Sequence, residues 1–171
     1  FKLFTKFGKG KVVSDVPFRR IKYKESMLKY VTDKPDLRNP IEIFDVTEIM
    51  NRDDVKLDIF KKLIANVSIV RAIPAPNASS KPRAFLDDIN NWAKEEGAKG
   101  LGYIIIENNK EKLKGKGTIG KFFSKNSIED LAKICNLKEN DAVFFSCDKE
   151  KNVERISGLA RQKLGKELNL I

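Results

Sequence analysis

The 171-residue sequence contains no histidine, the side chain that most often serves as general base or activates a nucleophile near neutral pH. This absence excludes a self-contained Ser–His or Cys–His enzyme. Only two cysteines occur, Cys135 and Cys147, both within apolar stretches, and no histidine is available to complete a zinc ligand set with them. We interpret both as buried thiols in a reducing compartment and predict no metal site.

Long apolar runs are also absent. The longest, such as Leu101–Ile106, suits a strand and is far shorter than the about 20 residues of a membrane span. We therefore predict a cytoplasmic protein with no membrane partner. The first residues, FKLFTKF, are too short for a signal peptide and do not begin with Met, which indicates a trimmed or excised piece of a longer protein.

Basic residues outnumber acidic ones, with 34 Lys and Arg against 24 Asp and Glu and a formal net charge of +10. Such an excess favours a polyanionic partner, because cations that meet phosphates release condensed counterions. The excess is concentrated in residues 1–29 and 99–125. These two stretches are the candidate electropositive faces, and nucleic acid is the partner that the charge favours.

The apolar spacing predicts an α+β fold from residue 67 onward, with element order β-α-β-β-α-β-α. This order predicts a two-layer sandwich, a mainly antiparallel sheet with helices on one face, preceded by an irregular N-terminal segment. Ser79 or Ser80 is the expected cap of the first helix, and Ser127 with Asp130 resembles a capping box at the second. The expected elements of the chain are helix 23–31, strand 41–45, helix 58–65, strand 67–74, helix 82–96, strand 101–106, strand 118–123, helix 127–135, strand 142–147 and helix 153–168.

The glycine-rich stretch GAKGLG, residues 97–102, raises the question of a phosphate-binding loop. In a dinucleotide-binding loop a strand precedes the glycines and a helix follows them, so that phosphate meets the free N–H groups at the helix start. Here the order is reversed, and the carbonyls at a helix C-terminus repel phosphate. We interpret Gly97 as the end of a helix, and Gly100 and Gly102 as the entry to a strand.

A second near-match is GKGTIGKF, residues 115–122, which has the glycine and lysine spacing of a P-loop. Phe122 occupies the position where a P-loop has Ser or Thr to hold magnesium, and no apolar strand precedes Gly115. The adjacent pair Asp87 and Asp88 has no base or metal partner in the pattern. We therefore predict no catalytic, cofactor-binding or metal-binding residue in this chain.

The lysines of residues 110–121 remain open to two interpretations. They form either a flexible basic loop that contacts phosphates or the solvated tip of a hairpin. A further group of cations lies on the last predicted helix. The hypothesis of contacts with a tRNA backbone rests on Lys112, Lys114, Lys116, Lys121, Arg161 and Lys163.

Six stretches occur in an order that is specific. They are TDKPDLRNPIEIFDVTE, VRAIPAPNASSKPRAFLDD, WAKEEGAKGLGYI, GTIGKFFS, DAVFFSCD and GLARQKLGKELNLI. Together they closely resemble the middle of bacterial-type aspartyl-tRNA synthetases, including the insertion called the GAD domain, over nearly the whole chain. The sequence departs from the family at Val31, where glycine is usual, and at GTIGKF, where GPIAKF is usual.

The resemblance implies a domain organisation and a role. Residues 1–44 lead from a class II catalytic domain, residues 45–150 form the insertion, and residues 151–171 lead back. The parent joins aspartate to tRNA through an aspartyl-adenylate with ATP and magnesium, and is expected to be a homodimer. None of the three class II motifs occurs here, since FRRIKY at Phe18–Tyr23 matches only superficially. The resemblance therefore implies an inactive, monomeric accessory module with no cofactor of its own, whose partners are tRNA and the rest of the synthetase.

Two alternatives remain at this point. The chain can be a stand-alone nucleic-acid-binding or scaffolding module. It can also be the GAD domain of a tRNA-dependent amidotransferase subunit, although the TDKPDLRNP turn is not expected beside that copy.

Overall fold

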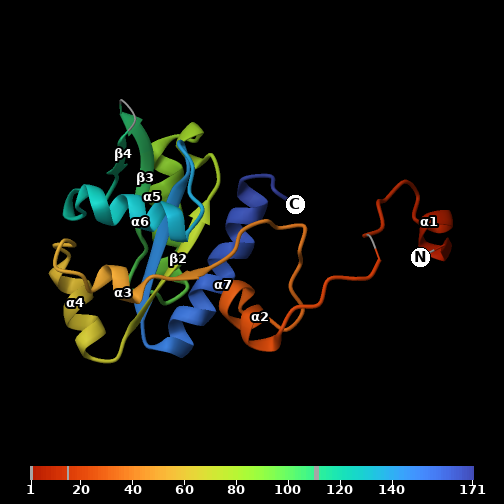
Figure 1. Cartoon of the computed structure of the whole chain (residues 1–171), viewed down its shortest axis with the longest axis horizontal. Helices are drawn as coiled ribbons and strands as arrows, with labels where there is room; N and C mark the ends of the chain where they lie inside the picture. The colour runs from red at the N-terminus through yellow and green to blue at the C-terminus, as the bar shows by residue number, and fades with distance from the viewer. Residues whose placement is uncertain (1, 15, 110–111) are drawn as a thin grey trace.

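The computed structural model describes residues 2–14, 16–109 and 112–171 (Figure 1). The elements are α1 (Lys2–Phe7), α2 (Tyr23–Tyr30), β1 (Phe44–Asp45), α3 (Thr47–Met50), α4 (Asp58–Ala65), β2 (Ile69–Ala75), the 3-10 turn η1 (Ala78–Ser80), α5 (Arg83–Glu95), β3 (Gly102–Asn109), β4 (Lys112–Lys116), the 3-10 turn η2 (Gly120–Phe122), α6 (Lys125–Ile134), β5 (Ala142–Asp148) and α7 (Glu150–Glu167). From β2 onward the helices and strands follow the predicted order β-α-β-β-α-β-α.

The strands form one open sheet in the order β1-β2-β5-β3-β4, and every described pairing is antiparallel. β5 is the central strand and pairs with β2 on one side and with β3 on the other. β2 and β3 are neighbours in the chain, separated by α5, yet in the sheet they are connected only through β5, the last strand of the sequence. The predicted α+β class and antiparallel sheet are confirmed.

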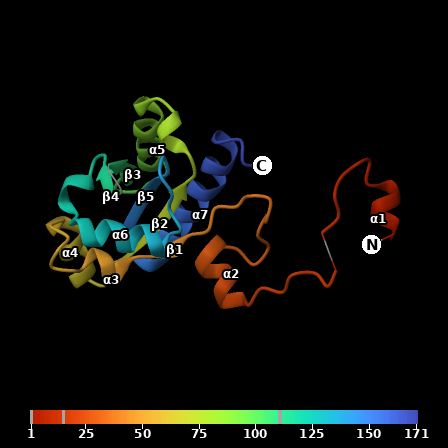
Figure 2. The same ribbon diagram turned by 45° about the horizontal axis from the view of Figure 1, so that its top comes forward.

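Helices cover both faces of this sheet, which differs from the one covered face predicted (Figure 2). Successive residues of β5 show why. Val143 and Phe145 pack in a cluster with residues of α3 and α6, whereas Ala142 and Phe144 pack in a second cluster with residues of α5 and α7. Side chains alternate between the faces of a strand, so an unbroken apolar run such as AVFF requires cover on both sides.

The lysine-rich stretch predicted as a loop or hairpin tip is strand β4, an edge strand that pairs with β3. The predicted strand over residues 118–123 is wrong, because that stretch contains η2. β4 packs closely against α6 and against side chains of β3. A Cβ on Gly115 would lie 2.6 Å from Ile128 Cδ1 of α6 and 2.7 Å from Ile104 Cγ2 of β3. Lysines on the outer positions of an edge strand are typical, since charge discourages pairing with another sheet.

The glycine stretch GAKGLG forms a turn from the end of α5 into β3, as interpreted from the sequence. Gly97 and Gly100 have φ values of +86° and +120°, which L side chains rarely adopt. The turn is closed by Asn90, whose Oδ1 accepts the N–H of Leu101 at 2.8 Å. A helix end and a bonded amide therefore occupy the place where a phosphate loop would have free N–H groups.

The two predicted helix caps were wrong, because Ser79 and Ser80 lie in η1 and α6 begins earlier than expected. The cap of α6 is Ser124, whose Oγ accepts the N–H of Ser127 at 3.0 Å. Asp130, assigned to a capping box from the sequence, instead pairs with an arginine from a distant segment. The sequence pattern therefore placed the cap three residues late.

Replacing Ser124 by alanine is expected to lower the free energy of unfolding by about 1 kcal/mol, the usual cost of losing a serine cap. Urea unfolding followed by circular dichroism measures the change. Lys125→Ala is the matched control at the adjacent, half-exposed position, where about 0.5 kcal/mol or less is expected. Equal effects for the two variants would contradict the assignment of the cap.

Both cysteines are free and buried, as predicted. Burial raises the pKa of the Cys135 thiol to about 12, and burial together with Asp148 raises that of Cys147 to about 11. A thiol in an unfolded chain has a pKa of about 8.5. The contribution of the two protonated thiols to the free energy of unfolding is therefore complete below about pH 8.5. It is lost as the pH rises from there toward the raised pKa values of the folded protein.

We expect neither thiol to react with a disulfide reagent such as DTNB at pH 8 in the folded protein, because only the thiolate attacks. Both should react in urea. The absorbance of released thionitrobenzoate counts the reactive thiols, and rapid reaction of one thiol without denaturant is the contrary result.

Among the helices that the structure describes, none is both long enough and apolar enough to cross a bilayer.

Candidate nucleic-acid interface

Two of the predicted phosphate contacts, Lys114 and Lys116, lie on one face of the edge strand β4. Leu113 and Gly115 face α6, so Lys114 and Lys116, which alternate with them, lie on the opposite face and are exposed. Lys114 is in register with Glu107 of β3, and Lys116 Nζ lies 3.3 Å from a Glu107 carboxylate oxygen. One carboxylate thus partly offsets two lysines.

A hollow of about 350 Å³ opens beside Lys116, between the β3–β4 hairpin and the start of α5. Its basic lining combines Lys116 with Lys81 and Arg83, from the segment that begins α5. The complete lining is Ser79, Lys81, Arg83, Leu86, Tyr103, Ile105, Glu107, Lys116 and Gly117. Three cations and one carboxylate therefore surround a hollow with apolar side chains among its walls, a combination suited to a sugar–phosphate backbone.

Lys81 and Arg83 were missed by the sequence reasoning, although a signal was present. A helix N-terminus carries partial positive charge, so cations there are unfavourable to the helix. The first turn of α5 nevertheless has no acidic residue, and Arg83 occupies its first position. Arg83 Nε is 3.9 Å from Asp87 Oδ2, and Lys81 Nζ lies 5.9 Å from the Phe85 ring centroid. These two contacts are long, and Arg83 also interacts with the Tyr103 side chain. Neither contact is a close ion pair, so both cations can turn toward a ligand.

The Tyr103 side chain, which lines the hollow, is fixed in position by its packing and by a hydrogen bond. Its ring is almost completely buried, 5.8 Å from the Phe144 ring centroid, and its hydroxyl donates to Asp87 Oδ1 at 3.1 Å. Burial, and then the bond to Asp87, raise the pKa of the Tyr103 hydroxyl. Asp87, for which the sequence pattern offered no base or metal partner, is therefore a hydrogen-bond partner of a buried tyrosine.

Lys121 lies elsewhere. It belongs to η2, where its Nζ lies 5.1 Å from the Phe122 ring centroid, and it borders a different hollow together with Asp53, Asp54 and Lys56. The fold therefore does not bring Lys121 to Lys116. Lys110 and the side chain of Lys112 lie outside the described residues.

The two predicted contacts on α7 do not join the hollow either. Lys163 Nζ lies 3.4 Å from Glu167 Oε1 and 5.3 Å from the Trp92 ring centroid. Arg161 is 3% exposed, and its guanidinium donates to three backbone carbonyls. The hypothesis that Arg161 contacts a tRNA backbone is corrected accordingly, because its donors face the protein interior. Counting the cations of a helix in the sequence does not show that one of them, Arg161, lies on the buried side.

A sequence profile of the family described as "GAD domain" matches residues 60–157, more than half of the chain. The chain belongs to the GAD domain family. The matched range overlaps the predicted insertion, residues 45–150, and contains every residue that lines the hollow beside Lys116.

Bacterial relatives extend the likeness across the chain. An aspartate–tRNA(Asp/Asn) ligase of Pelagibacter ubique is 49% identical over 169 residues, which are 99% of this chain and 28% of that protein. Ligases of the same name from Methylocella silvestris and Rickettsia bellii are 49% and 50% identical over 98% and 100% of the chain. Each is covered over 27% of its own length. The GAD-domain chain thus spans little more than a quarter of these relatives.

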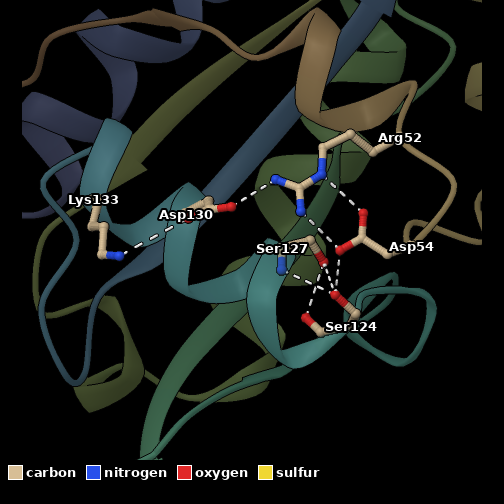
Figure 3. A network of polar contacts seen from close by, with 6 residues as sticks. All are labelled: Arg52, Asp54, Ser124, Ser127, Asp130 and Lys133. Atoms are coloured by element: carbon tan, nitrogen blue, oxygen red, sulfur yellow. Dashed lines mark hydrogen bonds and ion pairs between the residues drawn. The ribbon is translucent and has the colours of Figure 1, made fainter.

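A second polar cluster of the GAD-domain chain joins Arg52 and Asp54 to residues at the start of α6 (Figure 3). Arg52 donates to Asp54 at 2.9 Å and to Asp130 at 2.7 Å, and Ser124 Oγ donates to Asp54 Oδ2 at 2.5 Å. The bond from Ser124, with that from Arg52, lowers the pKa of the Asp54 carboxyl. Donors and acceptors satisfy one another, so we interpret the cluster as a clamp between the α3–α4 connection and α6.

In the segments that the structure describes, no group of three or more His, Cys, Asp and Glu side chains is arranged to hold a metal ion.

Proposed function

We propose that this chain is part of an aspartate–tRNA ligase, the enzyme that joins aspartate to its tRNA through an aspartyl-adenylate. The observation that carries the proposal is the 49–50% identity to proteins of that name over 98–100% of the chain. ATP and Mg²⁺ belong to a catalytic site in the remainder of the ligase. We call the insertion, residues 45–150, the GAD lobe. It is an accessory module, inactive by itself, within a ligase that is a homodimer.

The role proposed for the lobe is contact with the tRNA backbone through the hollow beside Lys116. Lys81, Arg83 and Lys116 border it and Lys114 extends the same strand face. Phosphate contacts orient a nucleic acid without reading its sequence. Such a lobe holds the tRNA while other parts of the ligase select it. Lys121 and Lys163 remain predicted contacts outside this hollow. Lys112, whose side chain lies outside the described residues, stays a predicted contact as well.

Binding of fluorescently labelled tRNA to the chain tests the role of the lobe. We expect weak binding at about 50 mM salt that falls linearly, on logarithmic axes, toward about 200 mM. A failure to bind even at the lowest ionic strength contradicts tRNA contact. The chain alone should also show no aspartate-dependent exchange between ATP and pyrophosphate, whereas the full-length protein should catalyse it. Absence of exchange in the full-length protein contradicts the ligase proposal itself.

A further inference from the structure

A buried arginine ties the last helix to a segment more than a hundred residues earlier. From α7, Arg161 Nε donates to the carbonyl of Ile41 at 2.7 Å, and Nη2 donates to the carbonyls of Asn39 at 2.9 Å and Asp36 at 3.0 Å. All three acceptors belong to residues 32–41, which connect α2 to the strand region and which we call the strap. The arginine side chain thus binds the backbone of the strap.

Asn39 returns the contact. Its Nδ2 donates to the carbonyl of Arg161 at 2.9 Å, and its Oδ1 accepts the N–H of Ile41 at 3.1 Å. Asn39 is 3% exposed and packs against Gly165, where a Cβ would lie 2.4 Å from Nδ2. Only a residue without a side chain fits there. The strap and α7 are therefore joined by reciprocal bonds, and we call this arrangement the latch.

The latch carries a buried charge whose partners in the described structure are carbonyl dipoles and an aromatic ring. The guanidinium carbon lies 4.8 Å from the centroid of the Tyr30 ring, and Tyr30 donates to Glu42 at 3.0 Å. Burial lowers the pKa of Arg161. Removing a cation from water is costly, and an apolar side chain of similar volume is often as good for stability. An apolar residue, however, has no donors and cannot form hydrogen bonds with three carbonyls of the strap.

The strap and α7 are also the two segments that connect the lobe to the rest of the ligase in the proposed function, as residues 1–44 and 151–171. A lobe attached through two connections that are fastened to each other moves as a rigid body, whereas separated connections let it swing. Geometry that is fixed in advance lowers the cost of positioning a bound group.

We propose that Arg161 is a positioning residue: through the latch it sets the orientation of the GAD lobe on the ligase, and so the placement of bound tRNA. This inference rests on the proposed function. In the proposed two-step reaction the adenylate forms from aspartate and ATP, and tRNA is a substrate of the second step alone. Opening the latch therefore impairs charging of tRNA and spares formation of the adenylate.

The experiment uses the full-length ligase with Arg161→Met. We expect the KM for tRNA to rise about tenfold, within the hundredfold that a misplaced group can cost, while ATP–pyrophosphate exchange stays within about twofold of wild type. Arg161→Lys should not rescue the defect, because an ammonium lacks the planar fork that reaches three carbonyls. Lys166→Met is the matched control, since it removes an exposed cation from the same helix.

Gly165→Ala provides a second variant in case Arg161→Met does not fold. It displaces Asn39 and leaves the arginine in place, so a smaller rise in the same KM is expected. Equal losses in exchange and charging for either variant would overturn the proposal, because they indicate general destabilisation. An unchanged KM for tRNA in a folded variant would overturn it as well.

Variants of the lobe's lysines separate this inference from the proposed function. If Lys116→Gln with Lys81→Gln leaves the KM for tRNA unchanged while the latch variants raise it, the hollow is not the tRNA contact and the latch stands. If the lysine variants raise it and the latch variants do not, the contact stands and the latch proposal fails.

Discussion

Replacing Phe145 by alanine is expected to lower the free energy of unfolding by about 3 to 5 kcal/mol, the range for truncating a buried phenylalanine. Phe145 is fully buried on the central strand β5, and its ring stacks on Phe123 at a centroid distance of 6.2 Å. Its removal leaves a cavity between the sheet and the helices of one face. Because β5 joins β2 to β3, the surrounding backbone has little freedom to collapse into that cavity.

Urea unfolding and thermal melting measure this loss, and a fall in melting temperature of about 10 °C is expected for a chain of this size. Phe7→Ala is the matched control, since Phe7 is 67% exposed on α1 and its truncation should change stability by about 0.5 kcal/mol or less. A loss below about 1 kcal/mol for Phe145→Ala contradicts the central role given to β5.

Replacing Lys81, Arg83 and Lys116 together by glutamine is expected to flatten the salt dependence of tRNA binding. Each lysine or arginine that meets a phosphate contributes about one to the slope of log affinity against log salt, so the slope should fall by about three. Affinity should fall most at low salt. The loss should be similar for any tRNA, because phosphate contacts carry no sequence information.

Three exposed lysines that do not line the hollow supply the control: Lys133, Lys138 and Lys151, also changed to glutamine. Both triple variants lose the same net charge. If they reduce tRNA affinity and slope equally, binding follows overall charge and the hollow has no special part. Titration by fluorescence anisotropy at four or five salt concentrations gives both slopes.

Local sequence signals located most elements well. The predicted helix over residues 58–65 coincides with α4, and the apolar run before Cys147 is β5. Errors arose where a local signal competed with another. Ser127 and Asp130 formed a plausible capping box, yet Ser124 caps α6 while Asp130 serves an arginine from the α3–α4 connection. The lysines of β4 obscured a strand because charged residues have low strand propensity, which an edge position tolerates.

The candidate interface shows the same limit more sharply. Lys114 and Lys116 were predicted as contacts because they cluster in the sequence. Lys81 and Arg83 lie more than thirty residues earlier, and they border the same hollow as Lys116 only because α5 begins beside the hairpin. Arg161 was assigned to the wrong class of contact. A buried and an exposed arginine have the same charge in a sequence, and only packing distinguishes them.

Taken alone, the sequence determined the class of fold, the order of elements, the reversed glycine turn and the likeness to a synthetase region, because each follows from neighbouring residues or from their order. The tertiary structure decided that helices cover both faces of the sheet, which cations share a hollow, and that Arg161 fastens α7 to the strap. Those outcomes depend on contacts between residues far apart in the chain, and local propensity does not encode such contacts.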